Sequence, residues 1–87
     1  MQKERELKEK SLTIFHKNLQ LLMKVRGEEE KAVDLADALD QSHQRVHHWV
    51  YGSCFPSPAM MIKICQHYKY FDIYRLLTVE LNKSEID

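Results

Sequence analysis

Between Ser42 and Gly52 the chain carries a run of side chains that can donate hydrogen bonds. They are His43, Gln44, Arg45, His47, His48 and Tyr51, and no acidic residue interrupts them. An α-helix fits the major groove of DNA, where the base edges present donor and acceptor patterns that Gln and Arg can read. These residue types therefore indicate recognition of DNA bases, and a solvated helix face is the plain alternative.

Two short predicted helices joined by a tight turn would position these groups. Apolar residues recur at helical spacing in both, as Leu35, Ala36 and Leu39 in the first and Val46, Trp49 and Val50 in the second. Ser42 precedes the second helix as a candidate N-cap, because its hydroxyl can accept from a free amide of the first turn. Gly52 follows that helix and can adopt the left-handed conformation of a helix C-terminus. The pattern is that of a helix-turn-helix.

The run from Asn18 to Leu77 resembles the helix-turn-helix domain of the phage repressor/Cro type, also called the xenobiotic-response-element family. The resemblance is carried, in order, by NLQLL with a following glycine, LADAL, S-x-x-x-V-x-x-W-x-x-G, the FPSP loop, MIKIC and RLL. The most specific part is the spacing of Ser42, Val46, Trp49, Gly52 and the Phe55-Pro56 pair.

In this family the second helix of the motif enters the major groove. The resemblance therefore implies base contacts from His43, Gln44 and His48, and it implies that Arg45 and the loop around Ser53 lie near phosphates. The complete predicted interface with double-stranded DNA is Ser42, His43, Gln44, Arg45, His47, His48, Tyr51 and Ser53.

The acidic run Glu28-Glu29-Glu30 departs from the family pattern. Acids in a first turn complement the helix dipole, so we expect this run to open the second helix, after Gly27 has ended the first. Members of the family usually carry a Ser or Thr followed by Gln near this point, and those groups contact phosphate. The connection here also looks longer. Three carboxylates beside a phosphate backbone would weaken binding, unless the longer connection carries them away from it.

The periodicity predicts an all-α fold of five helices, over 2–26, from about Glu28 to 39, and over 42–51, 58–68 and 72–82. Ser57 followed by Pro58 reads as an N-cap and first helical residue, and Asp72 as the cap of the last helix. The resemblance makes this a lambda-repressor-like helix-turn-helix domain with an extended first helix. We expect one domain over residues 1–87, with its core at about 12–82 and with loose ends at 1–10 and 83–87.

The first predicted helix carries two separate sets of apolar residues. Leu12, Phe15, Leu19 and Leu22 form one stripe suited to the core, and Ile14, Leu21 and Val25 lie well round the helix from it. The second set is explained either by a broad buried face or by a surface that meets another subunit. On the second explanation we predict a homodimer with an interface of Ile14, Leu21, Val25 and Leu81.

The formal net charge is zero, but the charge is unevenly distributed. Residues 1–27 carry seven Lys or Arg against three Glu, and residues 28–40 carry six acids against one Lys. Residues 41–71 contain no acid, while they contain Arg45, Lys63, Lys69 and four histidines. The chain is therefore locally basic around the predicted reading helix, as a nucleic-acid partner requires.

Several other classes of protein find no support in the sequence. No apolar run is long enough to span a membrane, and the densely charged start is unlike a signal peptide, so we expect a cytoplasmic protein. Cys65 reads as a core residue and Cys54 as a loop residue, and their spacing resembles no zinc signature. His43 and His47 could share a metal, but no third ligand is evident. Without a phosphate loop or nucleophile motif, we expect no enzyme, cofactor or small-molecule ligand.

The sequence thus predicts a dimeric, sequence-specific transcriptional regulator of the phage or mobile-element type, reading double-stranded DNA with residues 42–51. The alternative is a protein–protein interaction module, or an antitoxin-like protein, on the same fold. Such a module would use the long first helix and the acidic segment to bind a partner, with weak or no binding to DNA.

Overall fold

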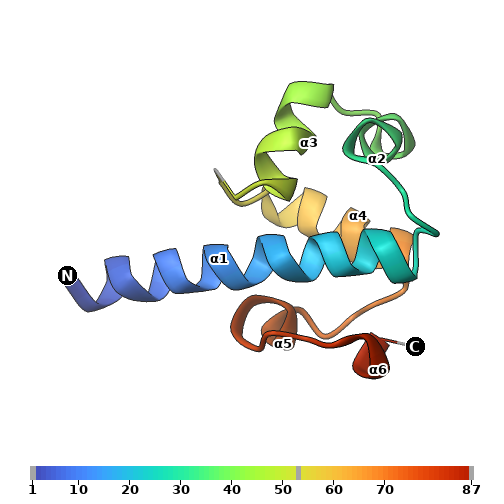
Figure 1. The fold of residues 1–87 in the computed structure, drawn as a ribbon. Helices are drawn as coiled ribbons and strands as arrows, with labels where there is room; N and C mark the ends of the chain where they lie inside the picture. Colours follow the sequence, from blue (N-terminus) through green and yellow to red (C-terminus); the bar gives the residue numbers. More distant parts are fainter. Residues whose placement is uncertain (1, 53, 87) are drawn as a thin grey trace.

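The computed structural model describes residues 2–52 and 54–86. This part of the chain contains six α-helices, joined by turns and short connections, and no strands. They are α1 (Gln2–Val25), α2 (Ala32–Leu39), α3 (His43–Val50), α4 (Pro58–Tyr68), α5 (Ile73–Thr78) and α6 (Lys83–Ile86). The long helix α1 crosses the middle of the molecule, with α2 and α3 on one side of it and α5 and α6 on the other (Figure 1). The all-α prediction is confirmed.

The apolar stripes predicted for the individual helices meet in one contiguous core. Its buried side chains include Phe15, Leu19 and Leu22 of α1, Leu35, Ala36 and Leu39 of α2, Val46, Trp49 and Val50 of α3, and Met61, Ile64, Cys65 and Tyr68 of α4. Burial of one large apolar side chain contributes about 1.5–3 kcal/mol, so this shared core holds α2 and α3 onto α1 and α4. Burial also raises the pKa of the Cys65 thiol, as expected for a cysteine in the core.

The connection between α1 and α2 differs from the prediction. Glu28 and Glu29 do not open a helix, because both adopt positive φ angles, of 53° and 67°, in the turn before α2. α2 begins only at Ala32, and the acid of its first turn is Asp34, which accepts from the backbone N–H of Lys31 at 3.0 Å. α1 ends at Val25, and a Cβ at Gly27 would lie 2.6 Å from the carbonyl oxygen of Met23. Glycine is therefore needed in this turn for a close approach of the backbone.

The predicted caps of the later helices are confirmed. Ser42 accepts a hydrogen bond from the backbone N–H of Arg45 at 3.2 Å, and Ser57 accepts one from Met60 at 3.3 Å. Asp72 caps α5 in the same way. Gly52 follows α3 with a φ of 90°, where a residue with a Cβ would be strained and would also clash with the ring of His16.

The predicted last helix over 72–82 is shorter in the structure, where α5 covers only Ile73–Thr78, because a buried side chain of α1 interrupts it. The amide of Asn18, fully buried, donates to the carbonyls of Leu76 and Val79, both at 2.8 Å, and accepts from the N–H of Leu81 at 2.9 Å. These backbone groups would otherwise continue the helix. α5 therefore stops at Thr78, and the chain runs extended through Val79 before α6.

Helical structure extends close to both ends of the described part of the chain. Residues 83–86 form α6, whose Ile86 is fully buried, and the guanidinium of Arg26 donates to the carbonyl of Ile86. The same guanidinium donates to the carbonyls of Tyr68 and Lys69, at 3.0 and 2.7 Å, so it ties α1, α4 and α6 together. At the other end α1 is helical from Gln2, and its exposed first turns project beyond the rest of the molecule (Figure 1).

Candidate nucleic-acid interface

The apolar side of α3 packs against the rest of the molecule and fixes the helix in place. Val46, Trp49 and Val50 are almost fully buried, and α3 packs against both α2 and α1. A three-residue connection of Asp40, Gln41 and Ser42 joins it to α2, with Asp40 in the left-handed conformation. The opposite side of α3 is therefore fixed in orientation and faces outward.

The outward side of α3 carries the donor residues that were predicted to read DNA. Ser42, His43, Gln44, Arg45, His47 and Tyr51 are exposed and His48 is partly buried. The rings of His47 and Tyr51 lie in contact, with centroids 4.5 Å apart, so this end of the helix is a small aromatic platform. The structure thus brings seven of the eight predicted residues onto one surface, and the eighth, Ser53, lies outside the described residues.

Two of these side chains already have partners within the protein. The Nε2 atom of His43 lies 2.9 Å from a carboxylate oxygen of Asp37, which α2 contributes. Arg45 donates to the side-chain oxygen of Gln41 at 3.1 Å. Acidic groups therefore border the start of α3, Asp37 through its contact with His43 and Asp40 along the chain. Gln44, by contrast, is exposed on α3 between His43 and Arg45.

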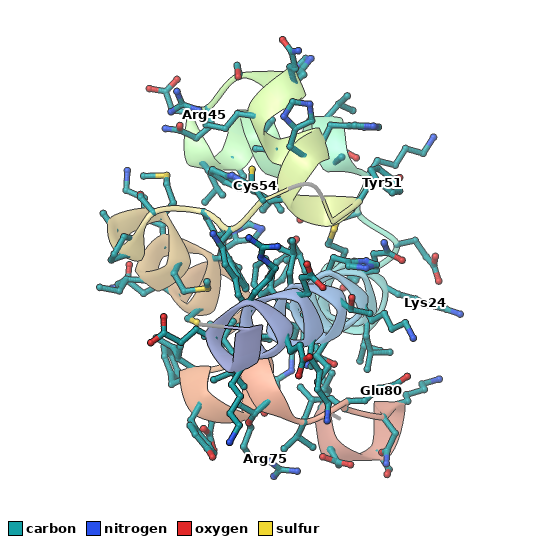
Figure 2. The ribbon with its side chains drawn as sticks, turned by 90° about the vertical axis from the view of Figure 1, so that its left-hand side faces the viewer. Lys24, Arg45, Tyr51, Cys54, Arg75 and Glu80 are labelled. Carbon is teal, nitrogen blue, oxygen red and sulfur yellow. The ribbon has the colours of Figure 1, made fainter. Side chains whose placement is uncertain are left out.

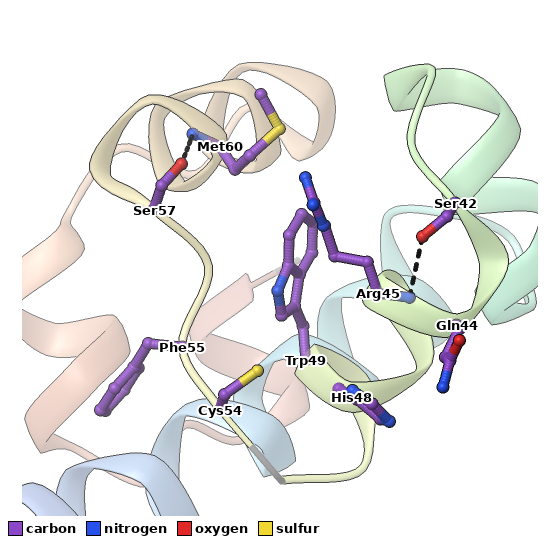
Figure 3. Close-up of a pocket in the computed structure, with 9 residues that line it drawn as sticks. All are labelled: Ser42, Gln44, Arg45, His48, Trp49, Cys54, Phe55, Ser57 and Met60. Atoms are coloured by element: carbon purple, nitrogen blue, oxygen red, sulfur yellow. Dashed lines mark hydrogen bonds between the residues drawn. The ribbon is translucent and has the colours of Figure 1, made fainter.

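A groove runs between α3 and the beginning of α4 (Figure 3). It measures about 480 Å³ and is lined by Ser42, Gln44, Arg45, His48, Trp49, Cys54, Phe55, Ser57 and Met60. Figure 3 shows Arg45 extending from α3 toward the side of α4, and both Arg45 and Trp49 line the groove.

On its other side α3 borders the acidic connection between α1 and α2. A second hollow, of about 610 Å³, is lined there by Lys24, Glu29, Lys31, His47 and Tyr51 among others. The surface next to the aromatic platform therefore carries charges of both signs. Lys24 and Lys31 were not assigned to the interface from the sequence, since each lies far from residues 42–51 along the chain.

Glu30 also lines the second hollow, but its carboxylate is hydrogen-bonded within the molecule. Its carboxylate accepts from the Tyr68 hydroxyl at 2.5 Å and lies 3.2 Å from Nε2 of His67, and its side chain is only 15% exposed. Burial, together with the hydrogen bond to Glu30 and its negative charge, raises the pKa of Tyr68 above the ordinary value of 10.0. The longer connection thus removes one of the three glutamates from solvent, while Glu28 and Glu29 remain exposed.

The four residues predicted as a dimer interface do not form one free surface. Leu81 is buried in the core, at 6% exposure, so it is unable to meet a second subunit without unfolding of its surroundings. Leu21 and Val25 are partly buried and pack against the core, and Ile14 is partly buried as well. The first of the two explanations, a broad buried face of α1, therefore accounts for much of this set.

Three further findings bear on function. Among residues 2–52 and 54–86, no three or more His, Cys, Asp or Glu side chains gather closely enough to hold a metal ion. Within the same ranges no helix combines the length and the apolarity needed to cross a bilayer. Comparison with protein-family models, with curated proteins and with solved structures finds no match for this chain.

Proposed function

We propose that this chain is a sequence-specific DNA-binding protein that reads the major groove with α3. One observation carries the proposal: α3 presents donor residues and no acid on its outward side, while its inward side is locked by Val46, Trp49 and Val50. A rigid helix with an exposed amide and an exposed guanidinium matches the requirement for reading base edges. On this proposal the fold is lambda-repressor-like and the protein acts in transcription regulation, with no catalytic activity and no cofactor.

The roles of the individual side chains follow from their surroundings. Gln44 is the base reader in this proposal, since its amide can donate to and accept from adenine at once. Arg45, His48 and the groove beside α4 approach the phosphates of one strand. His47 and Tyr51 border the second hollow, where Lys24 and Lys31 offset Glu29. The buried carboxylate of Glu30 lowers the number of acids that would face the backbone of DNA.

The proposal includes a homodimer, since a protein of this size gains affinity by binding two half-sites. Exposed apolar side chains on α4, α5 and the segment between them favour that surface over α1: Ile62, Phe71 and Tyr74 are 51%, 69% and 75% exposed. Next to them lies an almost wholly apolar hollow of about 310 Å³, lined by Pro56, Pro58, Met61, Ile62, Ile73 and Leu77. Burial of such a patch between two copies would stabilise a dimer.

Selection from random duplexes tests the proposal directly. The full chain, immobilised, is incubated at low salt with a pool of random double-stranded oligonucleotides, and bound duplexes are amplified and sequenced over several rounds. We expect enrichment of one motif, arranged as an inverted repeat. An unenriched pool, together with no retention of any labelled duplex at pH 6 and low salt, would contradict the proposal and favour the protein-interaction alternative.

A further inference from the structure

Four lysines lie along one exposed line of α1. Lys3, Lys10, Lys17 and Lys24 are seven residues apart, so they project from nearly the same side of the helix. All four are exposed, and within the described part of the chain only Lys17 among them forms an ion pair, with Nζ 3.8 Å from Glu80. Glu6 is the one acid of α1 at the same helical angle. The line is therefore strongly basic.

Apolar residues run directly beside these lysines. Leu7, Ile14 and Leu21 are also seven residues apart, each in the interval between two of the lysines. Leu7 is 63% exposed, and Ile14 and Leu21 are partly exposed. An apolar residue at every seventh position with charges at its flank is the pattern of a seam between two paired helices. We name these seven residues the lysine face.

No other element of the described chain lies over the lysines and Leu7 of this face, while Leu21 also packs against the core. In Figure 1, α1 runs across the front with α2 and α3 above it and α5 and α6 below it, and nothing lies over it. In Figure 2, which looks along α1 from its beginning, Lys24 points outward at the side of the molecule between Tyr51 and Glu80. At about 1.5 Å per residue the 24 residues of α1 span about 36 Å, so the face is long and straight.

We propose that the lysine face docks an amphipathic α-helix of a partner protein, with apolar residues at heptad spacing and Glu or Asp at their flanks. Its acids would pair with Lys3, Lys10, Lys17 and Lys24, while its apolar residues would cover Leu7 and Ile14. Complementary charge steers such an encounter and fixes the register of the two helices. The inference does not rest on the proposed DNA binding, since Lys24 is the one residue of the lysine face that also lines a hollow beside α3.

The charges and the exposed fractions of the lysine face argue against three other binding partners: a second copy of this chain, a membrane and a nucleic acid. A second copy of this chain would bring the lysines of both copies together with only Glu6 to offset them, and like charges in an interface are costly. A membrane surface requires an apolar face that inserts below the headgroups, and Leu7 is the only strongly exposed apolar residue of the lysine face. A nucleic-acid backbone would match the lysines but would leave Leu7 and Ile14 against phosphates.

Binding of a designed peptide tests the inference. The probe is a fluorescein-labelled helical peptide of about 21 residues, or three heptads, with Leu at the apolar positions and Glu at the flanks; a matched peptide carries Lys in place of Glu. Fluorescence anisotropy with the full chain should give saturable binding of the Glu peptide only. The variant K10E/K24E should weaken that binding at least tenfold and acquire binding to the Lys peptide.

A matched variant controls for total charge. K63E/K69E makes the same change in net charge at exposed positions on α4 and at its end, and we expect it to bind the Glu peptide as the wild type does. Circular dichroism verifies that each variant keeps its helices. The inference is overturned if the wild type shows no saturable binding of the Glu peptide up to about 100 µM, or if both double variants bind it equally. It is also overturned if phosphatidylserine vesicles or duplex DNA bind the lysine face and the Glu peptide does not.

Discussion

Gln44 is the side chain from which the base-reading proposal predicts the most specific effect. Its amide is exposed on α3, so the change Gln44→Ala would remove the two hydrogen bonds that the proposal assigns to a base, without disturbing the core. We expect a loss of about 1–3 kcal/mol on the selected site and little loss on random DNA, measured by anisotropy with labelled duplexes. Arg45→Ala is the matched control, and it should weaken all duplexes alike and flatten the salt dependence. Equal losses on selected and random DNA in the Gln44 variant would contradict base reading.

The histidines of α3 add a dependence on pH. A histidine gains positive charge as the pH falls from about 8 to about 6, and phosphates favour the charged form, so affinity for DNA should rise over this window. Nε2 of His43 already lies 2.9 Å from a carboxylate oxygen of Asp37, so the test addresses His47 and His48, which form no such contact with an acid within the described residues. The double change to Gln at these two positions should flatten a titration of Kd against pH at low salt. A wild-type affinity that is constant from pH 8 to pH 6 would contradict this role.

The element most dependent on one buried side chain is the α5–α6 segment. Asn18→Leu leaves the carbonyls of Leu76 and Val79 and the N–H of Leu81 without their partner inside the core. Each buried polar group left unpaired costs about 1–3 kcal/mol, so this variant should be destabilised by several kcal/mol in urea unfolding monitored by circular dichroism. Thr13→Ala, which removes a hydrogen bond on the exposed side of the same helix, should change stability little. An unchanged midpoint in the Asn18 variant would show that the interruption of the helix has another cause.

The hydrogen bond from Tyr68 of α4 to Glu30 of the α1–α2 connection predicts a loss of stability at alkaline pH. Burial first, and then Glu30, raise the pKa of Tyr68 in the folded protein above its value in the unfolded chain. The folded state therefore holds this proton more tightly, and the free energy of unfolding falls as the pH rises beyond about 10, the ordinary pKa of tyrosine. Urea unfolding between pH 8 and pH 11 should follow this slope in the wild type. Tyr68→Phe should reduce the slope, whereas Tyr74→Phe, at an exposed position, should leave it unchanged.

At the scale of the whole molecule, self-association through the apolar patch of α4 and α5 and self-association through α1 predict different effects of mutation. Sedimentation velocity at micromolar concentration should detect a two-chain species if the proposed homodimer forms. Tyr74→Glu places a charge in the exposed apolar patch of α4 and α5 and should dissociate it, while Lys10→Glu on the lysine face should not. A monomer throughout the concentration range would rule out the dimer. Dissociation by the Lys10 variant alone would assign it to α1.

Much of the architecture could be predicted from the sequence because the determining interactions are local. The i, i+3 and i+4 apolar spacing identified α1, α3 and α4, and the caps Ser42, Ser57 and Asp72 act within their own first turns. Gly52 likewise adopts the positive φ that its place after α3 requires. The exposed side of α3 follows from the same periodicity, since a helix that buries Val46 and Trp49 must present Gln44 to solvent.

Contacts between residues distant in the sequence decided the rest. Asn18 interrupts the last predicted helix from across the core, and Arg26 orders the tail by donating to Ile86, and neither effect has a local signal. The sequence of residues 41–71 contains no acid, yet tertiary packing brings Asp37 to His43 and turns Glu30 toward Tyr68. By itself the sequence therefore determined the extent of α1, α3 and α4 to within a residue or so, and which of their sides are apolar. Only the tertiary structure determined which charges meet, because charges interact across space while periodicity describes one helix at a time.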